Sequence, residues 1–278
     1  MVLPDGGTDI MDAGGDTILL SELSDTGVLR LTLNDPARRN ALSEKMMVAI
    51  QSTLDTVADD TAVRVIVLAS HGPAFCAGHD LKELTAGRAA DDGGKAYFTD
   101  IMAQCSAMMQ TIVRHPKPVI AEVRGIATAA GCQLVASCDL AYAAHDAKFS
   151  TPGVHIGLFC STPMVALSRN IAPKHAMEML LTGDMVNATR AVEMGLVNAA
   201  CAEDELTDAV LAVAAKIASK SSMTVKTGKR AFYEQAEMSL ADAYDYAAAI
   251  MVDNMLKRDA EEGVNAFLEK RDAVWHDE

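Results

Sequence analysis

One stretch rich in small residues limits most strongly what this chain can fold into: GIATAAGCQLVASCDLAYAAHDAKFSTPGVHIGL, residues 125–158. Glycine and alanine carry little or no side chain, so the backbone of such a stretch can approach other groups closely. A helix that starts at Ala129 and runs to Ser137 presents its first N–H groups to an anion or an oxyanion. Taken alone, the stretch is equally compatible with a tightly packed core helix.

A second small-residue turn lies upstream, in the segment PAFCAGHDLKEL at residues 73–84. It follows the run VRVIVLAS, which is apolar almost throughout and therefore predicts a strand buried on both faces. Two backbone N–H groups, one from each turn, can converge on a single carbonyl oxygen and stabilise the negative charge that develops there. A thioester is a natural substrate for such a pair, because its enolate oxygen needs that support.

The order of the predicted elements favours an α/β fold with a mainly parallel sheet. Strands are predicted at residues 17–23, 28–34, 63–70, 118–123, 140–144 and 197–201. Helices are predicted at residues 44–57, 96–114, 164–171, 174–181, 189–194, 206–218, 223–237, 240–257 and 261–275. Ser43 and Asp80 are suitable N-caps for the helices that follow them. We expect a flexible extension at residues 1–16, an α/β core at 17–200 and a helical oligomerisation region at 201–278.

Charge and composition exclude several classes of function. The 24 basic and 38 acidic residues give a net charge of −14, which argues against a nucleic-acid partner. No window reaches the roughly 18 uninterrupted apolar residues of a membrane span, so no membrane partner is expected. The six cysteines lack the spacing of metal ligands, so no metal site is expected and they are interpreted as small buried hydrophobes in a reducing compartment. The first residues lack the features of a signal peptide, and a cytoplasmic location is predicted.

Four motifs in a fixed order carry a family resemblance: PARRNALS, AFCAGHDLKEL, HPKPVIAEVRGIATAAGCQL and AKFSTPGVHIGL. From about Leu19 to Trp275 the chain resembles the crotonase (enoyl-CoA hydratase/isomerase) superfamily. It is most similar to the branch of enoyl-CoA hydratase domain-containing proteins with TAAGCQLVASCD and LFCSTP. The resemblance implies a spiral of ββα units with a C-terminal helical trimerisation region, assembled as a homotrimer or a dimer of trimers. It also implies an acyl-CoA partner, with coenzyme A as part of the thioester substrate and no tightly bound cofactor.

The resemblance assigns roles to particular residues. The oxyanion-hole amides would be those of His79 and Ala130. The positions that contact coenzyme A would be Arg38, Ala41, Ala77, Gly78, His79, Asp80, Leu81, Gly131, Phe267 and Lys270. Phe267 and Lys270 would reach coenzyme A bound to a neighbouring subunit, and for Lys270 a solvated helix position is an equal alternative.

The chain departs from the family where hydratases carry two glutamates, because Gln133 and Gly153 stand there. Neither residue titrates near neutral pH, and losing one acid/base group typically slows a reaction by about 10²–10⁴. His155 is a candidate substitute base, although a packed or solvated histidine fits that position better. Three functions stay open: a hydratase-like acyl-CoA enzyme with weak or different chemistry, a decarboxylase or thioester hydrolase that uses His79, Gln133 or His155, and a non-catalytic acyl-CoA-binding scaffold.

Overall fold

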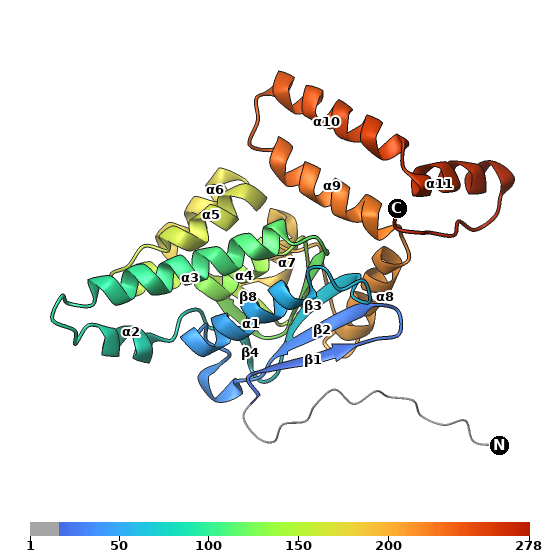
Figure 1. Cartoon of the computed structure of the whole chain (residues 1–278). Helices are drawn as coiled ribbons and strands as arrows, with labels where there is room; N and C mark the ends of the chain where they lie inside the picture. Colours follow the sequence, from blue (N-terminus) through green and yellow to red (C-terminus); the bar gives the residue numbers. More distant parts are fainter. Residues whose placement is uncertain (1–16) are drawn as a thin grey trace, which may run out of the picture.

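The computed structural model describes residues 17–278, and its centre is a mainly parallel sheet (Figure 1). The strands are β1 (Leu19–Leu23), β2 (Val28–Leu33), β3 (Val65–Ser70), β5 (Val119–Val123), β7 (Leu140–Ala144) and β10 (Ala199–Cys201), in the order β1-β2-β3-β5-β7-β10. Only β1 runs antiparallel to its neighbour among these strands. The predicted α/β class is therefore confirmed.

A second, smaller sheet lies beside the first. It contains β4 (Ala74–Cys76), β6 (Ile126–Thr128), β8 (Lys148–Ser150) and β9 (Val186–Asn187), in the order β4-β6-β8-β9. Strands β3, β5 and β7 in the large sheet are each followed along the chain by a strand of the small sheet and then by a helix, which gives a repeating ββα unit. The sequence did not predict any of these four strands, because two or three residues carry too little pattern to separate a strand from a loop.

The helices of the core cover both faces of the large sheet. They are α1 (Glu44–Val57), α2 (Leu81–Gly87), α3 (Lys95–Arg114), α4 (Ala130–Ser137), α5 (Ser161–Asn170), α6 (Pro173–Thr182), α7 (Ala188–Met194) and α8 (Leu206–Ala218), with short 3₁₀ turns η1 (Pro36–Arg38) and η2 (Pro152–Ile156). The Ser43 side chain accepts the Met46 amide at the start of α1, as predicted.

Strand β3 is buried on both faces, as its apolar run predicts. Ile66 and Leu68 belong to the large core shared with α1, α3 and α4. Val65 and Val67 belong to a second cluster beneath α8. Alternate side chains of β3 therefore pack against helices on opposite faces of the large sheet.

Helices α9 (Ser222–Gln235), α10 (Leu240–Met255) and α11 (Arg258–Glu269) project from this core. Every residue of α9 and α10 keeps part of its surface exposed within the described chain. The predicted boundary at residue 200 stays a prediction, and the structure places α8 directly against β2, β3 and β5.

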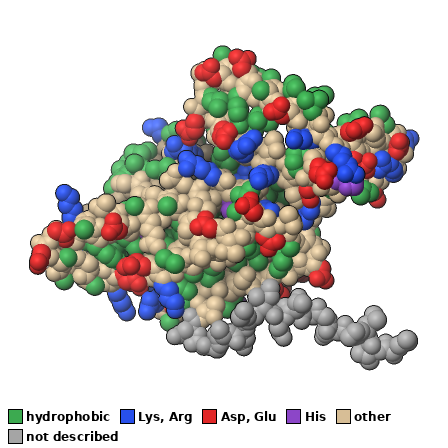
Figure 2. Space-filling view, viewed as in Figure 1, with side chains coloured by type: hydrophobic (Ala, Val, Ile, Leu, Met, Phe, Trp, Pro, Cys, Tyr) green, Lys and Arg blue, Asp and Glu red, His purple; other side chains and the backbone are tan. Residues whose placement is uncertain are grey.

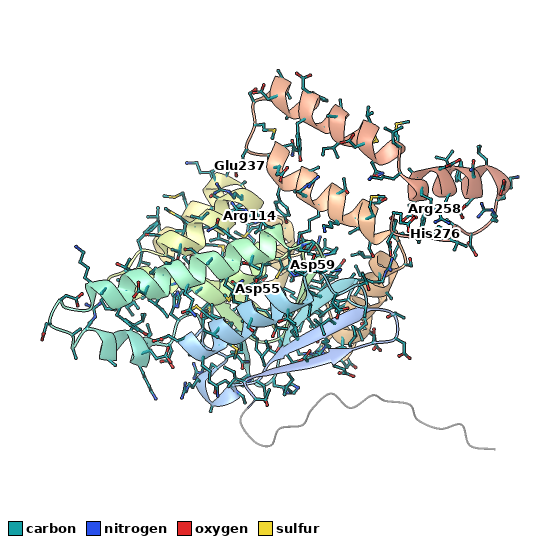
Figure 3. All side chains as sticks on the ribbon, in the orientation of Figure 1. Asp55, Asp59, Arg114, Glu237, Arg258 and His276 are labelled. Carbon is teal, nitrogen blue, oxygen red and sulfur yellow. The ribbon has the colours of Figure 1, made fainter. Side chains whose placement is uncertain are left out.

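The prediction of one helix over residues 261–275 is wrong at both ends. Helix α11 begins at Arg258 and ends at Glu269, where Lys270 takes a left-handed conformation with φ 56°. Beyond it the chain folds back, and the Asp259 carboxylate accepts the His276 and Asp277 amides. Figure 3 shows Arg258 and His276 close together at this return. The Glu262 carboxylate accepts the Val274 amide at 2.8 Å, so a side chain takes a backbone donor that a longer helix would need.

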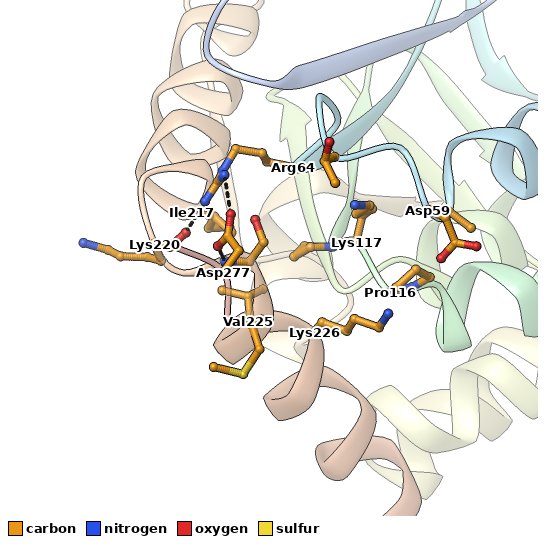
Figure 4. A pocket seen from close by; sticks show the side chains of 14 residues that line it. Asp59, Arg64, Pro116, Lys117, Ile217, Lys220, Val225, Lys226 and Asp277 are labelled. Carbon is orange, nitrogen blue, oxygen red and sulfur yellow. Dashed lines mark hydrogen bonds and ion pairs between the residues drawn. The ribbon is translucent and has the colours of Figure 1, made fainter. Parts of the chain in front are cut away.

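A cavity of about 260 Å³ lies where α8 and α9 meet the core (Figure 4). Arg64 donates to the carbonyls of Ala218 and Lys220 at the end of α8, and pairs with the Asp277 carboxylate at 3.1 Å. Asp277 in turn accepts the Ser222 amide at the start of α9. These contacts join two helices to the core.

Candidate functional site

The two small-residue turns lie against each other. Gly78 has φ +88°, and a Cβ built on it would stand 2.9 Å from the Ala129 Cβ and 3.2 Å from the Ala130 nitrogen. The Thr128 hydroxyl donates to the Ala77 carbonyl at 3.1 Å and so connects β6 to the first turn. Only glycine permits both the left-handed backbone and this close approach.

The two amides predicted to act together are those of His79 and Ala130. They directly follow Gly78 and Ala129, the residues at which the two turns meet. Within residues 17–278, neither the His79 amide nor the Ala130 amide donates a hydrogen bond. Ala130 is the first residue of α4, so its amide is one of the donors that a helix leaves unsatisfied. A Cβ on Gly131 would come within 2.1 Å of the Cys76 carbonyl oxygen, which shows how closely α4 packs against β4.

The predicted coenzyme A positions of the first loop gather beside this pair. The Ala77 amide donates to the Arg39 carbonyl at 3.1 Å, and the Leu42 amide donates to the Gly78 carbonyl at 2.8 Å. Buried Asn40 fixes the loop by donating to the carbonyls of His71 and Ala74. Loop η1 and the turn before α2 therefore form one surface.

Along that surface, Ala41 is buried, whereas Leu81 and Arg38 are exposed. The Arg38 side chain is 56% exposed and its guanidinium lies 3.9 Å from the Asp80 carboxylate. Asp80 also accepts the amides of Lys82 and Glu83, so the predicted N-cap of α2 is confirmed. The arrangement places an exposed cation beside the turn, within 3.8 Å of the Asp35 carboxylate and 3.9 Å of the Asp80 carboxylate.

The His79 imidazole is buried beside its own free amide. Burial lowers its pKa below the ordinary value, an effect that the nearby Leu42 backbone partly offsets. Neither ring nitrogen has a hydrogen-bond partner within the described part of the chain. The ring is therefore neutral at physiological pH, with one N–H donor and one acceptor nitrogen available.

The resemblance implies glutamates at two positions. The residue at position 133 carries no charge, and position 153 has no room for a side chain. Gln133, on α4, is 4% exposed, and its carboxamide oxygen has no partner among the described residues. A Cβ on Gly153 would stand 2.9 Å from both the Cys160 Sγ and the Leu158 carbonyl oxygen. Burial raises the pKa of the Cys160 thiol, so it stays protonated. Within residues 17–278, no Asp or Glu side chain pairs with His79, Gln133 or Gly153.

Three other predicted residues lie apart from the two amides. The His155 Nε2 is 2.8 Å from the Thr182 carbonyl, so this exposed ring is held at the end of α6. Phe267 is 83% exposed on α11, and Lys270 forms the C-cap of that helix. The chain does not bring α11 to its own α4, so a contribution of Phe267 and Lys270 to coenzyme A binding stays a prediction about a neighbouring subunit.

Thr151 is a residue that the sequence did not single out. It follows β8 directly, is fully buried, and its hydroxyl has no partner in the described chain. A signal was present, because residues at the carboxyl ends of parallel strands commonly line binding sites. Strand β8 has only three residues and no recognisable pattern, so the sequence does not reveal that Thr151 stands at such an end. Residues 17–278 contain no group of three or more His, Cys, Asp or Glu side chains suited to a metal ion.

Comparisons with known proteins agree with this architecture. The family model described as enoyl-CoA hydratase/isomerase matches residues 24–278. The human enoyl-CoA hydratase domain-containing protein 3, mitochondrial, is 46% identical over 91% of this chain and 82% of its own length. A crystal structure of an enoyl-CoA hydratase from Mycobacterium smegmatis has a TM-score of 0.90 and 49% identity over 94% of this chain and 100% of that one.

The crystal structure of the human domain-containing protein 3 has a TM-score of 0.88 and 44% identity, covering 93% of this chain and 100% of that one. The predicted crotonase-like fold and the resemblance to the domain-containing branch are thus both confirmed. The match spans the small-residue turns, the parallel sheet and the helices that project from it, and the chain belongs to the enoyl-CoA hydratase/isomerase family.

Proposed function

We propose that this protein binds a CoA thioester and stabilises its enolate form through the amides of His79 and Ala130, with little hydration of enoyl thioesters. The observation that carries the proposal is the adjacency of two unpaired amides at a place where no carboxylate pairs with the neighbouring side chains. The amides supply electrostatic stabilisation. Gln133 and Gly153 supply no group that can move a proton to or from water.

The family's relatives support the substrate class. One relative from Escherichia coli is named 2,3-dehydroadipyl-CoA hydratase, and it is 31% identical over 88% of this chain. The surface formed by η1 and the turn before α2 has an exposed arginine, which suits the phosphates of coenzyme A. Coenzyme A would thus enter as part of the substrate, with no tightly bound cofactor.

Crotonyl-CoA hydration by purified protein tests the chemistry. We expect turnover at least about 10²-fold below that of an ordinary hydratase assayed in parallel, because one or both proton-transfer groups are missing. Turnover equal to the ordinary enzyme would contradict the assignment of Gln133 and Gly153.

A pair of glycine variants tests the amide pair itself. Gly78→Ala places a methyl group against Ala129 and the Ala130 nitrogen, whereas Gly157→Ala, also at positive φ, meets nothing within 4 Å. Both substitutions strain the backbone, but only the first separates the two turns. By calorimetry we expect butyryl-CoA to bind Gly78→Ala at least tenfold more weakly than the unmodified protein, because a tenfold loss of affinity corresponds to about one lost hydrogen bond. We expect near-normal binding for Gly157→Ala. Equal affinities would exclude the amide pair from thioester binding.

A second candidate is decarboxylation or hydrolysis of a CoA thioester, favoured by the neutral, unpartnered His79 imidazole. Loss of CO₂ forms an enolate without a base, so it suits two amides and an uncharged neighbour. Release of CO₂ from malonyl-type thioesters would establish it. Binding of all thioesters without turnover would instead make the protein a non-catalytic acyl-CoA-binding scaffold.

We also propose a homotrimer or a dimer of trimers, supported by exposed apolar side chains on α10 and α11, among them Leu240, Tyr244, Met251 and Phe267.

The cellular compartment is a proposal too. The sequence favours the cytoplasm, whereas the vertebrate relatives are named mitochondrial. Among the described residues, no helix has the length and apolarity needed to cross a bilayer. Fractionation of cells that express the full chain decides the compartment.

A further inference from the structure

The cavity where α8 and α9 meet the core is lined by basic side chains, although the chain as a whole carries a net charge of −14. These side chains are Arg64, Lys117, Lys220 and Lys226. Of the four, only Arg64 forms an ion pair within residues 17–278, and its partner is Asp277. Three lysines without a carboxylate partner therefore border one cavity.

Lys117 differs from the other two lysines because both its backbone and its side chain are held in place. It stands between Pro116 and Pro118, whose rings restrict the backbone. Its amide donates to the His115 ring at 3.1 Å, and its side-chain nitrogen donates to the Asp60 carbonyl at 3.0 Å. Lys117 is half-buried, whereas the other two lysines are exposed. The cavity therefore has one fixed amine in its wall.

Four charged groups act on this amine. Burial lowers the pKa of Lys117, and the nearby Lys226 ammonium and Arg64 guanidinium lower it further, while the Asp59 and Asp60 carboxylates oppose them. The neutral amine, with its free electron pair, is the nucleophilic form of a lysine. At physiological pH a larger share of Lys117 than of an ordinary lysine is therefore ready to react.

We propose that Lys117 is a modification site, which takes an acyl group directly from a CoA thioester. The neutral amine attacks the thioester carbonyl carbon, so that a C–N bond forms and the C–S bond breaks. Coenzyme A leaves as its thiolate, and the proton released by the nitrogen neutralises the sulfur. Acyl-lysine and free coenzyme A are the products, and no other reactant is needed.

Lys226 is suited to assist this transfer. Its ammonium is exposed and without a partner in the described chain, so it can pair with a phosphate of the incoming thioester. Figure 4 shows Lys226 on the same side of the cavity as Lys117, whereas Lys220 extends away from it. Lys226 therefore raises the reactivity of the neighbouring amine and also attracts the acyl donor.

This reaction is separate from thioester binding by the His79 and Ala130 amides. Arg64 and Pro118 directly precede β3 and β5, so the cavity lies at the amino ends of these parallel strands. The chain reaches the two small-residue turns only after it leaves the carboxyl ends of the same strands. A thioester that acylates Lys117 thus approaches the opposite end of the sheet and does not use the amide pair.

Incubation of the full chain with acetyl-CoA, followed by digestion and quantitative mass spectrometry, tests the inference. At neutral pH we expect the initial rate of acetylation at Lys117 to be at least about fivefold higher than at the exposed Lys174 and Lys216, because more of Lys117 is neutral. Equal rates at the three lysines would overturn the proposal.

Variants at the cavity test the role of its second lysine. Lys226→Met should slow acetylation of Lys117 at least about twofold, because the pKa of Lys117 rises when the neighbouring cation is lost. Lys226→Arg keeps the charge and should restore the rate. Lys220→Met removes a lysine that extends away from Lys117 and should leave the rate unchanged. Equal slowing by Lys226→Met and Lys220→Met would overturn the assignment of Lys226.

Competitive labelling with acetic anhydride separates amine reactivity from simple exposure. This reagent carries no phosphate, so it reports the amine alone. The ratio of labelling at Lys117 to that at Lys174 should be highest near neutral pH and fall towards one as the pH approaches about 10, where ordinary lysines lose their protons. A ratio that is constant with pH would contradict the electrostatic origin of the reactivity.

A binding measurement distinguishes this inference from the proposed function. Lys117→Gln should bind butyryl-CoA with the affinity of the unmodified protein. Normal butyryl-CoA binding without preferred acetylation of Lys117 overturns the modification site alone. Preferred acetylation of Lys117 in a protein that does not bind butyryl-CoA overturns the proposed function alone.

Discussion

Among single residues, Ala129 stands out because its backbone is strained. It has φ 51° and ψ −119°, a region that residues with a side chain seldom adopt, and it immediately precedes the Ala130 amide. Strain of this kind typically costs about 1–3 kcal/mol and gathers at functional sites. Here it turns the chain sharply from β6 into α4, so that the first helical amide faces the Gly78 turn.

A matched pair of glycine substitutions measures that strain. Ala129→Gly should raise the free energy of unfolding by about 0.5–1 kcal/mol, because glycine adopts this backbone freely. Ala130→Gly should instead lower it by about 0.5–1 kcal/mol, since Ala130 already has helical geometry. Chemical denaturation of both variants gives the two values. A loss of stability in both would show that Ala129 is unstrained.

The residues that the sequence identified correctly act locally. Ser43 and Asp80 cap helices through their own backbone neighbours, so position along the chain predicts them. Thr151 and the contact of Cys160 with Gly153 depend on segments that meet only after folding. No pattern within one segment encodes such a meeting, so these features required the structure.

Among the elements, α9 packs against the core through Lys229, whose side chain is buried. The Lys229 side chain is 7% exposed, and its ammonium donates to the Asp139 carboxylate at 2.7 Å and to the carbonyls of Ile112 and Lys117. The Tyr233 hydroxyl donates to the other oxygen of Asp139 at 3.0 Å. Burial lowers the pKa of Lys229, and the nearby Asp139 opposes that change.

Removing this lysine should loosen the helix. Lys229→Met leaves the Asp139 carboxylate without its cation, and we expect the free energy of unfolding to fall by about 3 kcal/mol. The exposed Lys226, less than one turn earlier, provides the control: Lys226→Met should stay within about 0.5 kcal/mol of the unmodified protein. Thermal or chemical unfolding measures both, and equal losses would show that the buried pair does not fasten α9.

Strong apolar periodicity predicted most elements, including β3, α3 and α8. It failed for the four strands of the small sheet, whose pairing joins distant segments, and for the end of α11. There the Glu262 carboxylate holds the Arg271 guanidinium and the Val274 amide, which turns the chain back. Side-chain contacts that compete with a helix are invisible to periodicity.

For the whole molecule, the projecting helices expose a continuous apolar surface. Leu240, Tyr244, Met251 and Met255 recur along α10 at helical spacing, and each is more than half exposed. Figure 2 shows apolar side chains gathered over these helices at the top of the molecule. Apolar patches of this kind usually mark an interface with another chain.

Acidic substitutions on this surface should dissociate the proposed oligomer. The double variant Tyr244→Asp/Met251→Asp buries two unpaired charges in any interface formed by α10, so we expect a shift from trimer or hexamer to monomer. Val48→Asp, at an exposed apolar position on α1, serves as the control and should leave the mass unchanged. Light scattering after size exclusion reads out the mass. An unchanged oligomer in the double variant would exclude α10 from the interface.

The thiol of Cys160 against Gly153 also fixes how this protein can be re-engineered. A glutamate introduced at Gly153 alone collides at its first carbon with Sγ and with the Leu158 carbonyl. Because the Leu158 carbonyl belongs to the backbone, a smaller residue at position 160 would remove only one of these two collisions. Installing an acid at position 153 therefore requires the backbone after it to move as well as a change of the neighbouring side chain.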